Sequence, residues 1–274
     1  MTPIFGRASD ALTACIYDML TAGARECFCS PERQRMEKRQ TAPAPHAILS
    51  VSHLPPLEAG DHLDQATFHA RYEAMPPDFR AELIGGVVFV PSPLRLEHGE
   101  SHALIMGWLT NYWSATPGTS VRDNATAILG DDSEPQPDAT LVIEPERGGQ
   151  SSVSEDGYAT GPPELIVEVA SSSKSIDLHA KRRDYEQAGV LEYVVVVLRQ
   201  RVVRWFVLQD GTYREVEADA HGMFKSSVLP GLWLDAPALL RLDGRQVMAT
   251  LQHRIETPEH VAFVQQLQAR RSTS

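Results

Sequence analysis

Two nearly continuous apolar segments constrain the fold of this chain most. They read ELIVEVA at 164–170 and EYVVVVL at 192–198. A strand with one solvated face alternates apolar and polar residues, whereas a continuous apolar run is typical of a strand that is buried on both faces. Both segments therefore predict central strands of a sheet that is covered on each side.

Apolar periodicity predicts the elements around these strands. Helices are expected at 63–75, 97–115, 176–188 and 258–270, with a short helix within 231–240. Strands are expected at 120–129, 138–145, 202–208 and 212–218, and the polar segment 146–161 is expected to be a loop. Gly85-Gly86 supplies the positive φ angles of a tight two-residue turn, so 81–93 predicts a hairpin. This order predicts an α/β fold in which helices flank a mixed β-sheet.

Composition divides the chain into three parts. Residues 1–60 combine a basic run with segments rich in proline and alanine, which predicts a mostly disordered N-terminal extension. Within it, residues 8–24 are compatible with a short amphipathic helix, and Met36 is a candidate for the functional start. Residues 61–245 predict the folded domain, and 246–274 predict a C-terminal helical tail.

The cysteines and the hydropathy bear on the compartment. Cys15, Cys27 and Cys29 all lie in the predicted extension, and such an odd, clustered set indicates free thiols rather than a disulfide framework. A reducing cytoplasm is the expected location. No apolar run reaches the length that a membrane-spanning helix requires, so no membrane partner is expected.

The net charge of −11 argues against a protein that binds duplex DNA by charge alone, because nonspecific affinity comes from neutralising phosphates. The charge is uneven, since residues 174–204 hold seven basic and four acidic residues. Two interpretations stay open for this span: one locally basic face, or the solvated ends of a helix and a hairpin.

Two carboxylates lie at or within apolar strands, 30 positions apart. Asp138 follows Pro137 at the start of one predicted strand, and Glu168 lies inside ELIVEVA. Because side chains alternate along a strand, Glu168 shares one face with Glu164 and Ile166. An ionised carboxylate in such surroundings is costly unless it is paired or binds a cation. Two of them on neighbouring strands would suit Mg²⁺ or Mn²⁺.

The predicted helix 176–188 adds a cation to these carboxylates. Lys181 lies one turn from Asp177 and one turn from Tyr185, so the three side chains share a face. An ammonium group there would orient water or stabilise a pentavalent phosphorus. The alternative is an ordinary salt-bridged helix face. The combination points to metal-assisted hydrolysis, most simply of a phosphodiester.

The ordered set of motifs resembles the Uma-two family of restriction endonucleases, within the PD-(D/E)XK nuclease superfamily. The resemblance runs from about residue 82 to 240 and rests on AELIGGVVFVPSP, QPDATLVI, PPELIVEVASSS, SIDLHAKRRDYEQAGVLEYVVVV and SSVLPGLWLD. It implies a restriction-endonuclease-like core, a divalent metal cofactor and cleavage of DNA. Enzymes of this fold often pair to cut both strands, so the resemblance also implies a homodimer as an expectation.

The resemblance also implies roles for individual residues. It implies catalytic roles for Asp138, Glu168 and Lys181, metal ligation by Glu82, Asp138 and Glu168, and supporting roles for His98, Asp177 and Tyr185. One position departs from the superfamily motif, because Ala170 stands where the motif has its lysine. Lys181 is the expected replacement.

Two further groups of polar residues are candidates on spacing alone. His98 and His102 are four positions apart, which suits metal binding, although no third ligand is evident and His98 is expected only at the edge of the site. Asp131, Asp132 and Glu134 precede the Pro137-Asp138 motif and indicate a solvated turn.

The leading hypothesis is a Mg²⁺-dependent endonuclease that hydrolyses DNA phosphodiester bonds. The alternative is a non-catalytic binding or regulatory module on the same fold, since a fold does not establish a function. A hydrolase acting on another phosphorylated substrate is a third possibility.

Overall fold

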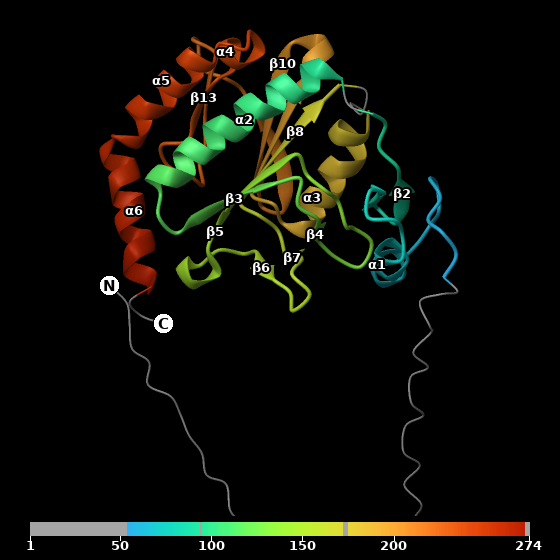
Figure 1. Ribbon diagram of the computed structural model, residues 1–274. Helices are drawn as coiled ribbons and strands as arrows, with labels where there is room; N and C mark the ends of the chain where they lie inside the picture. The colour runs from blue at the N-terminus through green and yellow to red at the C-terminus, as the bar shows by residue number, and fades with distance from the viewer. Residues whose placement is uncertain (1–53, 94, 172–174, 272–274) are drawn as a thin grey trace, which may run out of the picture. The chain divides into compact units, whose positions relative to one another are not determined.

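A six-stranded mixed sheet lies at the centre of the fold (Figure 1). The structure, a computed structural model, describes residues 54–93, 95–171 and 175–271. Across the sheet the strands are β11 (Thr212–Val216), β10 (Val202–Gln209), β9 (Glu192–Val197), β8 (Leu165–Ala170), β5 (Ala139–Ile143) and β3 (Thr119–Asp123). β8 and β9 run parallel, and the other neighbouring pairs run antiparallel. The predicted mixed α/β fold is therefore confirmed.

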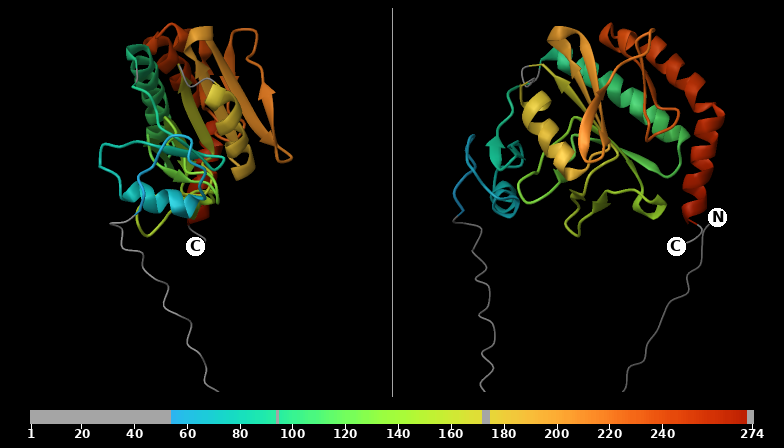
Figure 2. Two further views of the ribbon diagram at one scale, coloured as in Figure 1. Left: turned by 90° about the vertical axis from the view of Figure 1, so that its right-hand side faces the viewer. Right: turned by 180° about the vertical axis from the view of Figure 1, so that it is seen from behind.

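Helices cover both faces of this sheet (Figure 2). One face carries α2 (Leu96–Ala115), α4 (Ala236–Leu240) and α5 (Gly244–Ile255), with α6 (Pro258–Arg271) at the end of the chain. The other face carries the π-helical turn η3 (Ile176–Lys181) and α3 (Arg182–Ala188), which ends at Gly189 as expected. None of the helices in the described ranges is both long and apolar enough to cross a membrane.

The side chains of β8 pack alternately against the two helical layers that cover the sheet. Leu165, Val167 and Val169 pack into the core under α2, whereas Ile166 and Ala170 pack toward α3. This is the alternation that the sequence predicts. Because Glu168 has the parity of Ile166, its carboxylate points to the α3 side of the sheet.

Some segments differ from the prediction. The expected strand 120–129 is broken at Asn124, whose φ of 47° is left-handed, so β4 (Ala127–Ile128) is separate from β3. The expected loop 146–161 contributes two strands that form a small sheet with β4. These are β6 (Ser152–Val153) and β7 (Ala159–Thr160), after the 3-10 turn η2 (Pro145–Arg147). A hairpin of β12 (Met223–Lys225) and β13 (Trp233–Asp235) was also not predicted, since three-residue strands are too short to show a period.

The N-terminal part of the described chain forms a smaller core. It consists of α1 (Gln65–Glu73) and the predicted hairpin, made by β1 (Glu82–Ile84) and β2 (Val87–Phe89). Gly85 and Gly86 take φ angles of 56° and 74°, as the two-residue turn requires. Leu57 is buried in the same cluster as Phe68, so packing begins before residue 61.

The connection between β9 and β10 is the short 3-10 turn η4 (Leu198–Gln200). The remaining expectations for the N-terminal extension lie outside the described residues; they concern the helix at 8–24, Met36 and the three cysteines. The domain boundaries at 60 and 245 stay a prediction.

Candidate active site

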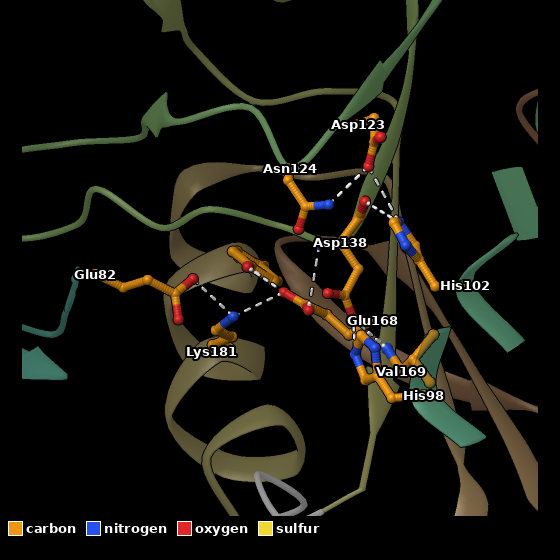
Figure 3. A network of polar contacts seen from close by, with 10 residues as sticks. Glu82, His98, His102, Asp123, Asn124, Asp138, Glu168, Val169 and Lys181 are labelled. Atoms are coloured by element: carbon orange, nitrogen blue, oxygen red, sulfur yellow. Dashed lines mark hydrogen bonds and ion pairs between the residues drawn. The ribbon is translucent and has the colours of Figure 1, made fainter. Parts of the chain in front are cut away.

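The structure brings Asp138 and Glu168 together on neighbouring strands (Figure 3). β5 pairs antiparallel with β8 so that Ala139 lies opposite Val167, which places Asp138 beside Glu168. Val169 N donates to Asp138 Oδ2 at 2.7 Å, and Asp138 N lies 3.5 Å from Glu168 Oε2. The two carboxyl groups therefore share one corner of the sheet.

Lys181 reaches this corner from η3. Its Nζ lies 2.8 Å from Glu82 Oε1 and 2.9 Å from Glu168 Oε1, and its side chain is only 6% exposed. Tyr185, one turn further along, donates its hydroxyl to the same Glu168 oxygen at 2.9 Å. The face predicted for Lys181 and Tyr185 thus contacts the predicted glutamate directly.

Glu82 is held from two sides. Its Oε1 accepts a hydrogen bond from Gln136 N at 2.7 Å in addition to the contact from Lys181. The hairpin that carries Glu82 is also tied to α3, because Gly85 N donates to Asp184 Oδ2 at 2.7 Å. The helix that carries the lysine and the hairpin that carries its partner are therefore fixed to one another.

Two histidines of α2 hold Asp138 from the other side (Figure 3). His98 Nε2 lies 3.3 Å from Asp138 Oδ2, and His98 is buried. His102 Nε2 lies 2.9 Å from the main-chain oxygen of Asp138 and 3.2 Å from Asp123 Oδ1. Because both partners of His102 Nε2 are acceptors, this nitrogen carries the proton. Asn124 Nδ2 also donates to Asp123 Oδ1, at 2.7 Å.

The structure adds residues to the corner that the sequence did not indicate. His102, Asp123 and Asn124 were not predicted as site residues; only the four-residue spacing of His98 and His102 was a signal for the first of them. Asp177 is buried on the expected helix face, and its main-chain oxygen accepts a hydrogen bond from the hydroxyl of Tyr193 at 2.9 Å.

The expected solvated turn before Pro137 is wrong for one of its residues. Asp131 and Asp132 are exposed, whereas Glu134 has no exposed surface. The carboxylate of Glu134 accepts hydrogen bonds from α1, a contact that local charge alone does not reveal.

Burial, together with the neighbouring charges, shifts the pKa values of the site. Burial raises the pKa of Glu168 well above its ordinary value; the charge of Lys181 opposes this shift, and the charges of Asp138 and Asp177 reinforce it. Burial also disfavours the Lys181 cation, but the carboxylates of Glu168 and Glu82 outweigh it, and the pKa of Lys181 is raised well above its ordinary value. Lys181 is therefore charged at neutral pH.

Asp138 differs from Glu168 in this respect. Burial works to raise the pKa of Asp138, but the hydrogen bond and charge of His98, with the hydrogen bond from Val169 N, lower it below its ordinary value. The site thus pairs Asp138, whose pKa is lowered, with Glu168, whose pKa is raised.

The oxygen atoms of Asp138 and Glu168 provide some of the ligands that a divalent cation needs. Among the described residues, no group of three or more His, Cys, Asp or Glu side chains has the arrangement of a metal site. Within the same residues, Asp138 Oδ1 accepts no hydrogen bond, and Glu168 Oε2 has only the 3.5 Å contact with Asp138 N. Two carboxylate oxygens on adjacent strands suit Mg²⁺, which takes few protein ligands and keeps water and substrate oxygens.

The fold and this corner define a restriction-endonuclease-like protein, and comparisons with known proteins agree. Residues 66–237 match the family model Uma2, described as "Putative restriction endonuclease". The match spans more than half of the chain, and the chain belongs to this family.

One solved structure illustrates the fold. It is described as a putative nuclease belonging to DUF820 from Anabaena variabilis ATCC 29413, and it resembles this chain with a TM-score of 0.50 and 12% sequence identity. The likeness covers 63% of this chain and 96% of that one, and at this identity it concerns the fold alone. No curated protein matches the chain.

Proposed function

We propose that the chain is a divalent-metal-dependent endonuclease that hydrolyses DNA phosphodiester bonds. Membership of a nuclease family supports a nucleic-acid substrate. The observation that carries the proposal is the position of Lys181 Nζ, 2.8 and 2.9 Å from Glu82 and Glu168, beside Asp138. The superfamily motif has its lysine at the position of Ala170. Lys181 would supply the missing ammonium group from the neighbouring turn η3.

Charge balance supports a cation at this corner. The carboxylates of Glu82, Asp138 and Glu168 face one ammonium group, that of Lys181, so when all are ionised two negative charges are left over. Burial is the main cause of the raised pKa of Glu168, and the neighbouring carboxylates add to it. One divalent cation would cancel the two excess charges. Asp138 and Glu168 would hold the cation, and Glu82 would complete the ligand set through its second oxygen.

Each residue then has a definite task. A divalent cation held there would lower the pKa of a water molecule and offset charge developing on the phosphate. Lys181 has three N–H donors, of which Glu82 and Glu168 take two, and the third would donate to a phosphate oxygen or to water. Tyr185 keeps Glu168 oriented.

The remaining supporting residues act on the two charged groups. His98 keeps the Asp138 carboxylate oriented toward the corner. Asp177 helps to keep Lys181 charged, since its carboxylate raises the pKa of that lysine. Neither residue needs to touch the phosphate to support its hydrolysis.

A second candidate is a non-catalytic binding or regulatory module. It is favoured by one observation, namely that Lys181 already pairs with both Glu82 and Glu168, so the corner is partly neutralised without a metal. Pairing of two chains as a homodimer stays a prediction under either function.

Calorimetric titration with Mn²⁺ tests the proposal. Wild type is expected to bind the ion, and a variant with Asp138→Ala and Glu168→Ala is expected to lose this binding, because both strands' oxygen ligands are removed. A matched control carries Asp78→Ala and Glu146→Ala, two exposed carboxylates, and should bind like wild type. Absence of binding to the wild type, with and without DNA, would favour the non-catalytic module.

A further inference from the structure

One face of α1 is polar and contacts the segment that precedes Asp138. Gln65, His69 and Tyr72 follow a spacing of four and then three residues, which places them on the same side of a helix. Gln65 Nε2 donates to Glu134 Oε2 at 2.7 Å, and His69 Nδ1 lies 2.9 Å from Glu134 Oε1. Tyr72 OH accepts from Gln136 Nε2 at 2.8 Å. Helix α1 therefore contacts the segment 134–136 at two residues, Glu134 and Gln136.

That segment leads into the site. Glu134 and Gln136 are two positions apart, so their side chains share the side that faces α1. Pro137 and Asp138 follow directly. The segment that bears the first catalytic carboxylate is thus anchored to α1 just before it enters β5.

The same segment also holds Glu82. Glu134 and Leu83 exchange both main-chain hydrogen bonds, at 2.9 and 3.1 Å. Gln136 N then donates to Glu82 Oε1 at 2.7 Å, and the same oxygen accepts from Lys181 Nζ at 2.8 Å. A continuous chain of contacts therefore runs from α1 through Glu134 to Lys181.

His69 is suited to anchoring rather than to chemistry of its own. Its Nδ1 faces the fully buried carboxylate of Glu134, and its Nε2 lies 3.7 Å from Asp156 Oδ2. Its ring also packs edge-on against Tyr158, with the ring centroids 4.8 Å apart. Both ring nitrogens thus face carboxylates, and the ring is fixed.

We propose that Glu134, held by Gln65 and His69 of α1, is a positioning residue that keeps Glu82 against Lys181 and so sets the place of the Lys181 ammonium group. This inference rests on the proposed function for its catalytic meaning, because Glu134 would act through Glu82 and not on the phosphate itself. The contact chain can nevertheless be tested without any cleavage assay.

The test uses two substitutions of His69 that differ in one donor. An asparagine side chain keeps an N–H close to the position of Nδ1, so His69→Asn preserves the contact with Glu134, whereas His69→Leu removes it. The readout is the ¹H–¹⁵N signal of the Lys181 ammonium group in the full chain. Only four lysines are present in the sequence, at positions 38, 174, 181 and 225, and Lys181→Met assigns the signal.

We expect His69→Leu to shift or broaden the Lys181 signal and His69→Asn to leave it near its wild-type position. In steady-state DNA cleavage, His69→Leu should lower kcat by about 10- to 100-fold with KM within about 2-fold, the pattern of a misplaced catalytic group. His69→Asn should restore most of kcat. Thermal unfolding verifies that each variant is folded.

A milder variant protects the test against misfolding. Gln65→Met removes only one donor to Glu134 and should shift the same signal by less. An unchanged Lys181 signal in folded His69→Leu and Gln65→Met would overturn the inference. A wild type that cuts no DNA, together with a shifted signal in His69→Leu, would remove the proposed function and keep the positioning role.

Discussion

Asp138→Asn is expected to lower the rate of DNA cleavage by about 10³-fold, because it removes a ligand of the proposed cation, and loss of one electrostatic contributor to a transition state has an effect of this size. Asparagine keeps the shape of the side chain, and its amide oxygen still accepts the hydrogen bond from Val169 N. It lacks the negative charge that a hard cation requires. The loss should therefore appear in the cleavage rate while the unfolding curve stays close to wild type.

Cleavage of supercoiled plasmid under single-turnover conditions, with Mg²⁺ and with Mn²⁺, measures this effect. Asp210→Asn is the matched control, because Asp210 is exposed in the β10–β11 turn at a φ of 51° that asparagine tolerates. The control should cut at the wild-type rate. Equal rates for Asp138→Asn and wild type would contradict the assignment of the site.

Lys181→Met should cost about 3–5 kcal/mol of unfolding free energy at neutral pH, the usual effect of removing one partner from a buried ion pair. Methionine has a similar length but leaves Glu168, which is 3% exposed, without its cation. Urea unfolding followed by circular dichroism measures the change. Lys225→Met is the control, because Lys225 Nζ lies over the ring of Trp233 and its side chain is 48% exposed; its cost should stay within about 1 kcal/mol.

The pH dependence of this loss has a definite sign. The folded-state pKa of Glu168 is raised, and removing Lys181 removes the charge that holds it down, so this pKa rises further. A carboxyl group with a raised folded-state pKa destabilises the fold increasingly as pH rises above its ordinary value. The cost of Lys181→Met should thus be smallest in acid and grow toward neutral pH. Adding Glu168→Gln should recover part of it, and a strictly additive double variant would contradict the pairing.

The parts of the site that lie within one regular element were predictable from the sequence. The alternation along β8 places Glu168 on one face, and the four-residue spacing within 176–188 places Lys181 and Tyr185 together. The alternation along a strand and the four-residue spacing along a helix each depend on one element alone, so the sequence is sufficient to predict them. The meeting of Asp138 with Glu168 on neighbouring strands also followed from the strand pattern, whereas Glu82 was assigned only through the resemblance to the family.

Contacts made by irregular segments left no such signal. Asp123, at the end of β3, meets His102 of α2 because β3 lies beside β5, and Asn124 in turn donates to Asp123. Glu134 is buried where α1 contacts it. Composition predicts that a turn rich in carboxylates is solvated, and tertiary packing overrides that prediction. The two-residue strands β4, β6 and β7 were missed for a related reason, since two residues are too few for an alternating pattern to repeat.

The π-helical turn η3 sets the sequence interval between Glu168 and Lys181. This interval matters when the equivalent lysine is sought in related sequences. Lys181 stands 13 positions after the glutamate that it contacts, and a π-helical turn accommodates one residue more than an α-helical turn does. Deleting one residue between 176 and 181 would rotate the lysine by about 100° relative to the residues before it. A relative with an ordinary α-helical turn would carry its lysine one position earlier for the same contact. Search patterns that fix the glutamate-to-lysine interval would separate such relatives, whereas a pattern with a one-residue gap would unite them.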